Sequence, residues 1–102
     1  MKIPKELLIK GKLWKVEYKW NLRLGDVKCN GICDFPSRTI LLDRLSDKET
    51  KWLALLHEIV HAVLHEAHLH EDGGVDGFVE EAICASIADV FNELFELKWK
   101  KK

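Results

Sequence analysis

Two histidines and a glutamate form the part of the sequence that is best suited to chemistry. Residues 53–65 contain His57-Glu58-Ile59-Val60-His61, the pattern His-Glu-x-x-His, inside an apolar run. In an α-helix, residues four apart share a face, so the His57 and His61 imidazoles would lie one above the other. Two imidazoles at that spacing can bind one tetrahedral zinc ion. Glu58 points in a neighbouring direction, which suits a general base that acts on a metal-bound water.

The apolar residues around this motif place it at the border of a helix face. His57 and His61 fall on the edge of an apolar stripe, with Glu58 and His65 just beyond it. Such a border gives a zinc site a dry wall and an open side for substrate. The alternative interpretation is a surface-edge helix that carries several histidines and no metal. The residues of the stripe are Leu53, Leu56, Ile59, Val60, Val63 and Leu64.

A catalytic zinc ion needs a third protein ligand, with water in the fourth position. Metzincin-type enzymes use a third histidine after a glycine, but Leu64 and Ala67 stand at those positions, which excludes that class. The gluzincin alternative takes a glutamate from the following helix, where Glu80 and Glu81 stand near the start. On a helical wheel, Glu80 lies on the apolar side and Glu81 on the polar side. Because a carboxylate on a buried face is costly unless it is paired or binds metal, Glu80 is the better candidate and Glu81 the alternative.

Other polar residues near the motif have less specific interpretations. His65 lies too far along the helix to join the same metal, so it is expected to hydrogen-bond a ligand, to act on an oxyanion or simply to pack. His68 and His70 belong to a polar stretch that is expected to be a solvated helix end. Cys29-x-x-x-Cys33 resembles half of a zinc knuckle, but no second ligand pair has matching spacing.

Length and composition indicate one small domain that works in the cytoplasm. The chain has 102 residues, a hydrophobic fraction of 47% and a net charge of −1, which argue for a globular fold and against nucleic-acid binding through bulk charge. No apolar run is long enough to span a membrane. The N-terminus lacks a signal-peptide pattern, and three cysteines are an odd number, so reduced thiols in the cytoplasm are expected.

The fold is expected to be α+β, with a small antiparallel sheet of about three strands packed against two long helices. Alternation over Trp14, Val16, Tyr18 and Trp20 predicts a strand with these side chains on one face. Asn30-Gly31 predicts a hairpin. The remaining expectations are an extended segment or strand at 7–9, strands at 32–35 and 39–42, and turns at 25–26 and 36–37.

Two helices are expected in the second half of the single domain 1–102. Ser46 and Glu49 have the form of a capping box, so an active-site helix should occupy residues 46–72, ending near His70 before Gly73-Gly74. Asp76 can cap a second helix over 76–98, which would carry the third ligand after the β-rich residues 1–45. The stripe that this helix is expected to bury comprises Val79, Ile83, Ile87, Val90, Phe91 and Leu94.

Residues 57–65, followed by Glu80-Glu81-Ala82-Ile83, resemble the ImmA/IrrE-type and minimal gluzincin metallopeptidases, small zincins that occur in phages and prophages. The resemblance covers the second half of the chain. It implies a zincin-like fold in which His57, His61 and Glu80 bind zinc and Glu58 activates water. Ile83-Cys84 stand where that family usually has alanine followed by asparagine or aspartate, which leaves the choice between Glu80 and Glu81 open.

The expected function is therefore a zinc metallopeptidase that hydrolyses peptide bonds in a peptide or protein substrate. The alternative is a non-catalytic protein of the same fold that binds a partner or regulator, with zinc as a structural pin or absent. A DNA-binding repressor finds no support, because the chain has no helix-turn-helix pattern or basic face.

Overall fold

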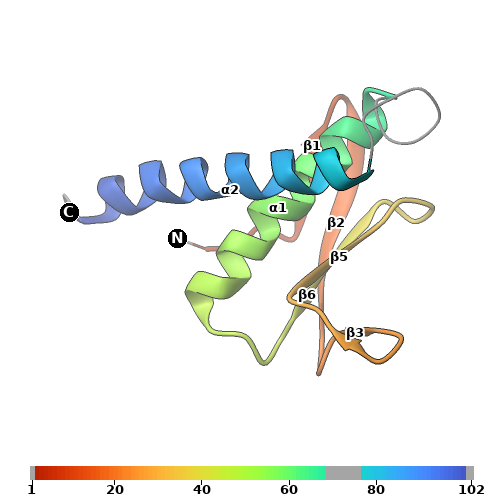
Figure 1. The fold of residues 1–102 in the computed structure, drawn as a ribbon, viewed down its shortest axis with the longest axis horizontal. Coiled ribbons are helices and arrows are strands. Elements are labelled where there is room, and N and C mark those ends of the chain that lie inside the picture. The colour runs from red at the N-terminus through yellow and green to blue at the C-terminus, as the bar shows by residue number, and fades with distance from the viewer. Residues whose placement is uncertain (1, 69–76, 101–102) are drawn as a thin grey trace.

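A computed structural model describes residues 2–68 and 77–100, with side chains up to residue 94. The fold is α+β, as the sequence predicts, and consists of a main sheet, a small two-stranded sheet and two helices that cross each other (Figure 1). Within the described ranges, no helix has both the length and the apolar composition that a membrane crossing needs. The elements are β1 (Glu6–Ile9), β2 (Lys12–Lys19), β3 (Arg23–Leu24), β4 (Val27–Lys28), β5 (Gly31–Asp34), β6 (Thr39–Asp43), α1 (Lys48–Glu66) and α2 (Gly77–Lys100).

The main sheet has four strands in the order β1-β2-β6-β5, and it is mixed, not antiparallel. Strands β1 and β5 pair antiparallel with their neighbours, whereas the central strands β2 and β6 run parallel. The expectation of about three antiparallel strands was therefore wrong in number and direction. A parallel pair needs a connection of a dozen or more residues, and residues 20–38 provide it by forming β3, β4 and the edge strand β5 on the way.

The predicted hairpin at Asn30-Gly31 was also wrong, because the hairpin forms at the earlier turn signal. Gly25 adopts a φ of 63°, and with Asp26 it joins β3 to β4 in a separate two-stranded sheet. Gly31 instead begins β5, and the Asn30 carbonyl accepts a hydrogen bond of 3.0 Å from the Asp43 backbone N–H. Asn30 thus extends the pairing between β5 and β6.

The core lies between the sheet and α1. Trp14 and Val16 on β2 are buried on the face that alternation predicted, whereas Trp20 lies beyond the end of β2 and is 70% exposed. Ile40 and Leu42 on β6 are buried beside Leu55 and other apolar residues of α1. Because α1 packs against both β5 and β6, its motif-bearing face is held next to an edge of the sheet.

The N-cap of helix α1 lies one residue later than predicted, and the helix ends earlier. The N-cap is Asp47, not Ser46: its carboxylate accepts a hydrogen bond of 2.7 Å from the Thr50 backbone N–H. The helix ends at Glu66, and His68 follows with a φ of 60°, a left-handed conformation that stops helical pairing. The predicted end near His70, the stop at Gly73-Gly74 and the cap at Asp76 lie outside the described residues.

Helix α2 buries a different face from the one predicted. Among residues 77–94, the buried ones are Glu80, Cys84 and Ala88, spaced four apart, while Ile83 is only half-buried. Figure 1 shows α2 crossing α1 and continuing beyond it. The crossing places Glu80 and the short side chains of Cys84 and Ala88 on the buried face, and most of the long apolar side chains are exposed. The large apolar residues of α2 that are exposed, among those described, are Phe78, Val79, Ile87, Val90, Phe91 and Leu94.

Two buried carboxylates connect distant segments of the fold. Glu66, at the end of α1, accepts hydrogen bonds from Trp14 Nε1 at 2.8 Å and from Arg38 Nε at 2.6 Å. Asp43, at the end of β6, forms an ion pair with Lys28 and accepts a hydrogen bond of 3.2 Å from the Leu22 backbone N–H. The Asp43 contacts tie the β3–β4 hairpin to the main sheet.

These carboxylates predict that acid destabilises the fold. The pKa of Glu66 is lowered from 4.5 to about 2, chiefly by its hydrogen bond from Arg38, and that of Asp43 from 3.8 to about 2, chiefly by Lys28. Since both pKa values are lower in the folded chain, their stabilisation is complete above about pH 4.5 and is lost as the pH falls toward 2. Urea unfolding across this range should give a free energy of unfolding that falls with pH. The fall should be shallower in Glu66→Gln, and equal slopes would contradict this assignment.

Candidate metal centre

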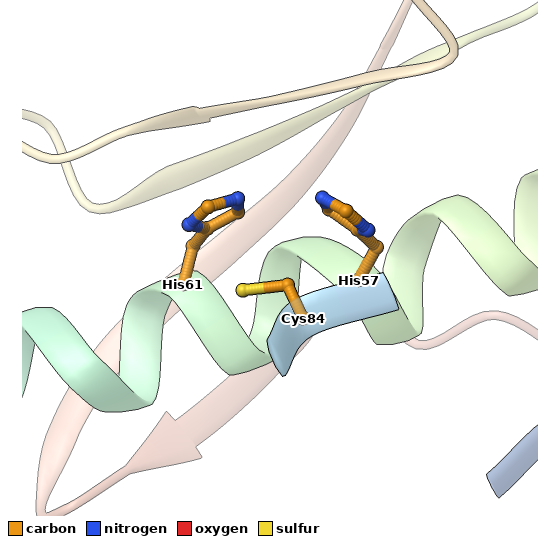
Figure 2. A group of neighbouring side chains, drawn as sticks. All are labelled: His57, His61 and Cys84. Carbon is orange, nitrogen blue, oxygen red and sulfur yellow. The ribbon is translucent and has the colours of Figure 1, made fainter. Parts of the chain in front are cut away.

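Helix α1 presents His57 and His61 side by side on one face. Their ring centroids lie 5.0 Å apart with an interplanar angle of 60°. Figure 2 shows both rings above the same side of α1, with Cys84 reaching toward them from α2. His61 is buried and His57 is half-buried, so the pair stands at the border between core and solvent. The helical spacing predicted this arrangement.

Glu81 on α2 faces the Nε2 atoms of both rings. One carboxylate oxygen lies 2.7 Å from His61 Nε2 and the other lies 3.2 Å from His57 Nε2. The two Nε2 atoms therefore converge on the same small space, as the ligands of a shared ion must. The Glu81 side chain is 62% exposed, so this space opens toward solvent.

Glu80 contacts the other nitrogen of His61. Its carboxylate lies 2.5 Å from His61 Nδ1, and the residue is only 2% exposed. The helical wheel predicted that Glu80 is buried. A carboxylate that accepts the Nδ1–H of a histidine fixes the tautomer and leaves Nε2 with a lone pair for a metal. Glu80 is thus placed to orient the His61 ring, whereas Glu81 is placed to bind the same metal ion as His61.

Cys84 is a further donor at this site, and no sequence pattern predicted it as a ligand. It lies one helical turn after Glu80 and is fully buried. Its Sγ and one ring nitrogen each from His57 and His61 lie within 4.8 Å of one another. Burial, aided by the nearby Glu80 and Glu81, raises the pKa of the thiol to about 12. The spacing Glu80-x-x-x-Cys84 was the signal that could have revealed it, because it puts both side chains on one face.

Glu58 lies beside the pair, against the start of β5. Burial is the main cause that raises its pKa from 4.5 to about 7. A β-carbon at Gly31 would lie only 3.0 Å from Glu58 Cγ and 3.3 Å from Glu58 Oε2. The absence of a side chain at Gly31 therefore makes room for the Glu58 carboxylate.

A cavity of about 560 Å³ opens next to these residues. One wall is α1 and the start of α2, and the other is β5 with the tip of the β3–β4 hairpin. Cys29 and Cys33 both line it, and burial raises the pKa of the Cys33 thiol. The lining residues are Leu24, Cys29, Asn30, Gly31, Ile32, Cys33, Phe35, Thr50, Leu53, Ala54, His57, Glu58, His61 and Glu81.

In the part of the chain that the structure describes, strand β5 is an edge of the main sheet and pairs only with β6. Its residues 31–34 align with residues 42–39 of β6 in antiparallel register, and Asn30 continues that register opposite Asp43. Backbone groups alternate in direction along an antiparallel pair. Since the Asn30 carbonyl points toward β6, the backbone groups of Gly31 and Cys33 point to the open edge, on the side of the cavity.

The remaining histidines have different surroundings. The His65 ring stacks on Phe35 with a centroid distance of 4.4 Å and makes an edge contact with Trp14 at 6.5 Å. Of the three roles that the sequence left open for His65, these contacts support packing. His68 is exposed beyond the end of α1, and His70 lies outside the described residues.

No protein-family model, curated protein or solved structure matches the chain significantly. Its chemistry therefore has to be inferred from the site itself. Imidazole, carboxylate and thiolate groups are the usual protein ligands of zinc, and they are the donors that converge here. The residues fit a zinc ion, whereas a magnesium or calcium site would be built of oxygen atoms.

Proposed function

We propose that the chain is a zinc-dependent metallopeptidase of zincin-like fold and gluzincin type, acting on a peptide or protein substrate. The observation that carries the proposal is the convergence of His57 Nε2 and His61 Nε2 on one carboxylate, at 3.2 and 2.7 Å. Glu58 stands next to His57 in the sequence and lines the same cavity. A pair of ligands, a separate carboxylate and an adjacent open space are the parts that zinc-assisted hydrolysis requires.

His57 and His61 would hold the ion through Nε2, and α2 would supply the next ligand. The sequence favoured Glu80 for this role, with Glu81 as the alternative. The contacts favour Glu81, because its oxygens already lie near both Nε2 atoms, while Glu80 lies at His61 Nδ1. A bound zinc ion would polarise the substrate carbonyl and make a water molecule easier to deprotonate.

Glu58 is the proposed general base. Its carboxylate would take a proton from the attacking water and deliver it to the amine that leaves when the peptide bond breaks. Glu58 is buried, its carboxylate lies close to Gly31, and the residue lines the cavity, so the carboxylate can reach a substrate from a fixed position.

The open edge of β5 is the proposed substrate platform. An extended peptide can add to a sheet edge through main-chain hydrogen bonds. The outward backbone groups of Gly31 and Cys33 lie along the cavity that Glu58 and His57 also line. A peptide paired there would run past the metal site with its carbonyls at defined positions.

Gly31→Ala is expected to lower kcat by about tenfold while leaving zinc affinity unchanged, because a small displacement of a catalytic group is costly. The added Cβ would press on Glu58 at 3.0 Å, but it meets neither histidine among its nearest atoms. Steady-state kinetics and a zinc titration would separate the two effects. The matched control is Gly77→Ala, whose added Cβ has no atom within 4 Å. Equal kcat values for both variants would contradict the packing role of Gly31.

Cleavage of a peptide library by the purified chain tests the proposed function directly. Hydrolysis should occur with zinc, stop with a chelator and return when zinc is restored. Zinc binding without any cleavage would overturn the peptidase and favour the alternative, a zincin-fold protein that binds a partner. Cleavage that a chelator leaves unchanged would exclude zinc from the reaction.

A further inference from the structure

The buried thiol of Cys84 has no role in the proposed reaction, yet it lies among the metal-binding groups. Its Sγ is grouped with nitrogens of His57 and His61 within a span of 4.8 Å, although it comes from a different helix. Its residue is fully buried, so it is inaccessible to an external thiol or substrate. A group with this location can interact with a bound ion far more readily than with solvent.

We propose that Cys84 is itself a ligand of the metal ion that His57 and His61 hold, so that the site contains a metal–sulfur bond. The inference rests on the proposed zinc site, but it does not depend on whether the chain cleaves peptides. Two imidazoles and one thiolate form a recognised type of zinc ligand set. Figure 2 shows the sulfur directed from α2 toward the histidine-bearing face of α1.

The packing of the two helices explains why a cysteine fits at this position. The buried face of α2 comprises Glu80, Cys84 and Ala88, and it crosses α1 where His57 and His61 stand. A cysteine side chain is short, so its sulfur reaches an ion only when the helix backbones are close. Glu80 meets His61 from the same face of α2, one turn before Cys84, which shows that this face is in direct contact with His61.

Coordination would convert the thiol to a thiolate. The S–H bond breaks, a sulfur–metal bond forms, and one proton leaves to solvent. The negative sulfur would offset part of the charge of a divalent cation in a buried location. A thiolate is also a soft ligand, so the site would select zinc over magnesium, calcium and manganese.

A sulfur ligand also changes the role of Glu81 at the site. With His57, His61 and Cys84 as three protein ligands, Glu81 would occupy the fourth position. Because Glu81 is 62% exposed and Cys84 is fully buried, Glu81 is the ligand that can be displaced. Its departure would open the position that a catalytic zinc site keeps for water or substrate.

Cobalt absorption spectroscopy of the full-length chain tests the sulfur ligand. Co²⁺ bound to the wild-type chain should show a sulfur-to-cobalt charge-transfer band in the near ultraviolet. Cys84→Ser should lose this band and bind the metal more than about 100-fold more weakly, since even the loss of an outer-shell partner costs roughly 10–100-fold. Cys29→Ser and Cys33→Ser are matched controls, because both thiols line the adjacent cavity, and both variants should keep the band.

The outcomes separate this inference from the proposed function. Bound cobalt without a sulfur band, or a band that survives in Cys84→Ser, would overturn the sulfur ligand and leave the zinc peptidase standing. A wild-type chain that binds no metal would overturn both. If Cys84→Ser does not fold, zinc X-ray absorption of the wild-type chain decides the question: one sulfur near 2.3 Å is expected, and a shell of nitrogen and oxygen alone would contradict it.

Discussion

Glu58→Gln should lower kcat by about 10²–10⁴-fold and leave zinc bound to the chain, since this is the range that general acid–base catalysis contributes. The amide keeps the shape of the side chain but cannot accept a proton from water. Glu58 is not among the groups that face the Nε2 atoms, so its charge is not needed as a ligand. Burial of the side chain beside Gly31 should hold the glutamine in the same position.

The control for this variant is Glu49→Gln. Glu49 lies in the first turn of the same helix and is exposed, so its replacement removes the same charge far from the site. Single-turnover cleavage and zinc content should be measured for both variants. A Glu58→Gln chain with full activity on a true substrate would rule out the proposed base.

His61→Ala is expected to abolish stoichiometric metal binding, and with it any hydrolysis. His61 is the residue that links both carboxylates, since Glu81 faces its Nε2 at 2.7 Å and Glu80 its Nδ1 at 2.5 Å. Its loss removes one ligand and also the ring that the buried Glu80 contacts. Because removing one partner of a buried polar pair is costly, the melting temperature should fall as well.

His65→Ala separates loss of the metal from loss of packing. His65 lies one turn further along α1 and stacks on Phe35. Its replacement should cost about 0.5–1.5 kcal/mol in aromatic contact but leave metal affinity unchanged. Isothermal titration with zinc and thermal unfolding of both variants would show the contrast. A His61→Ala chain that binds zinc as tightly as the His65→Ala chain would show that His61 is not a ligand.

The local features of the site could be predicted from sequence because helical spacing alone defines them. His57 and His61 share a face of α1 in any regular helix, and Glu80 was predicted to be buried from its place on the helical wheel. A ligand role for Cys84 could not be predicted from sequence, because it depends on which face of α2 packs against α1. The positions of the long apolar side chains predicted that a different face of α2 would be buried, but most of these side chains are exposed where α2 crosses α1.

The features of the fold that could not be predicted from the sequence depend on long-range pairing between strands. The parallel pairing of β2 with β6 joins segments on either side of β3, β4 and β5, and no local pattern encodes it. Asn30-Gly31 and Gly25-Asp26 were both valid turn signals, but only the second became a hairpin. Ser46 and Asp47 are both good N-cap residues. The Ser46 hydroxyl instead lies within hydrogen-bond distance of Asp43 and of the distant Asn30, and Asp47 caps the helix.

Anomalous diffraction at the zinc edge, from crystals of the chain grown with zinc, tests the central claim most directly. One strong peak is expected within about 2.0–2.1 Å of both His57 Nε2 and His61 Nε2, the usual zinc–nitrogen distance, with a donor atom from α2 completing the contact. A peak elsewhere on the chain, or imidazoles that face apart with no peak between them, would contradict a metal centre between α1 and α2.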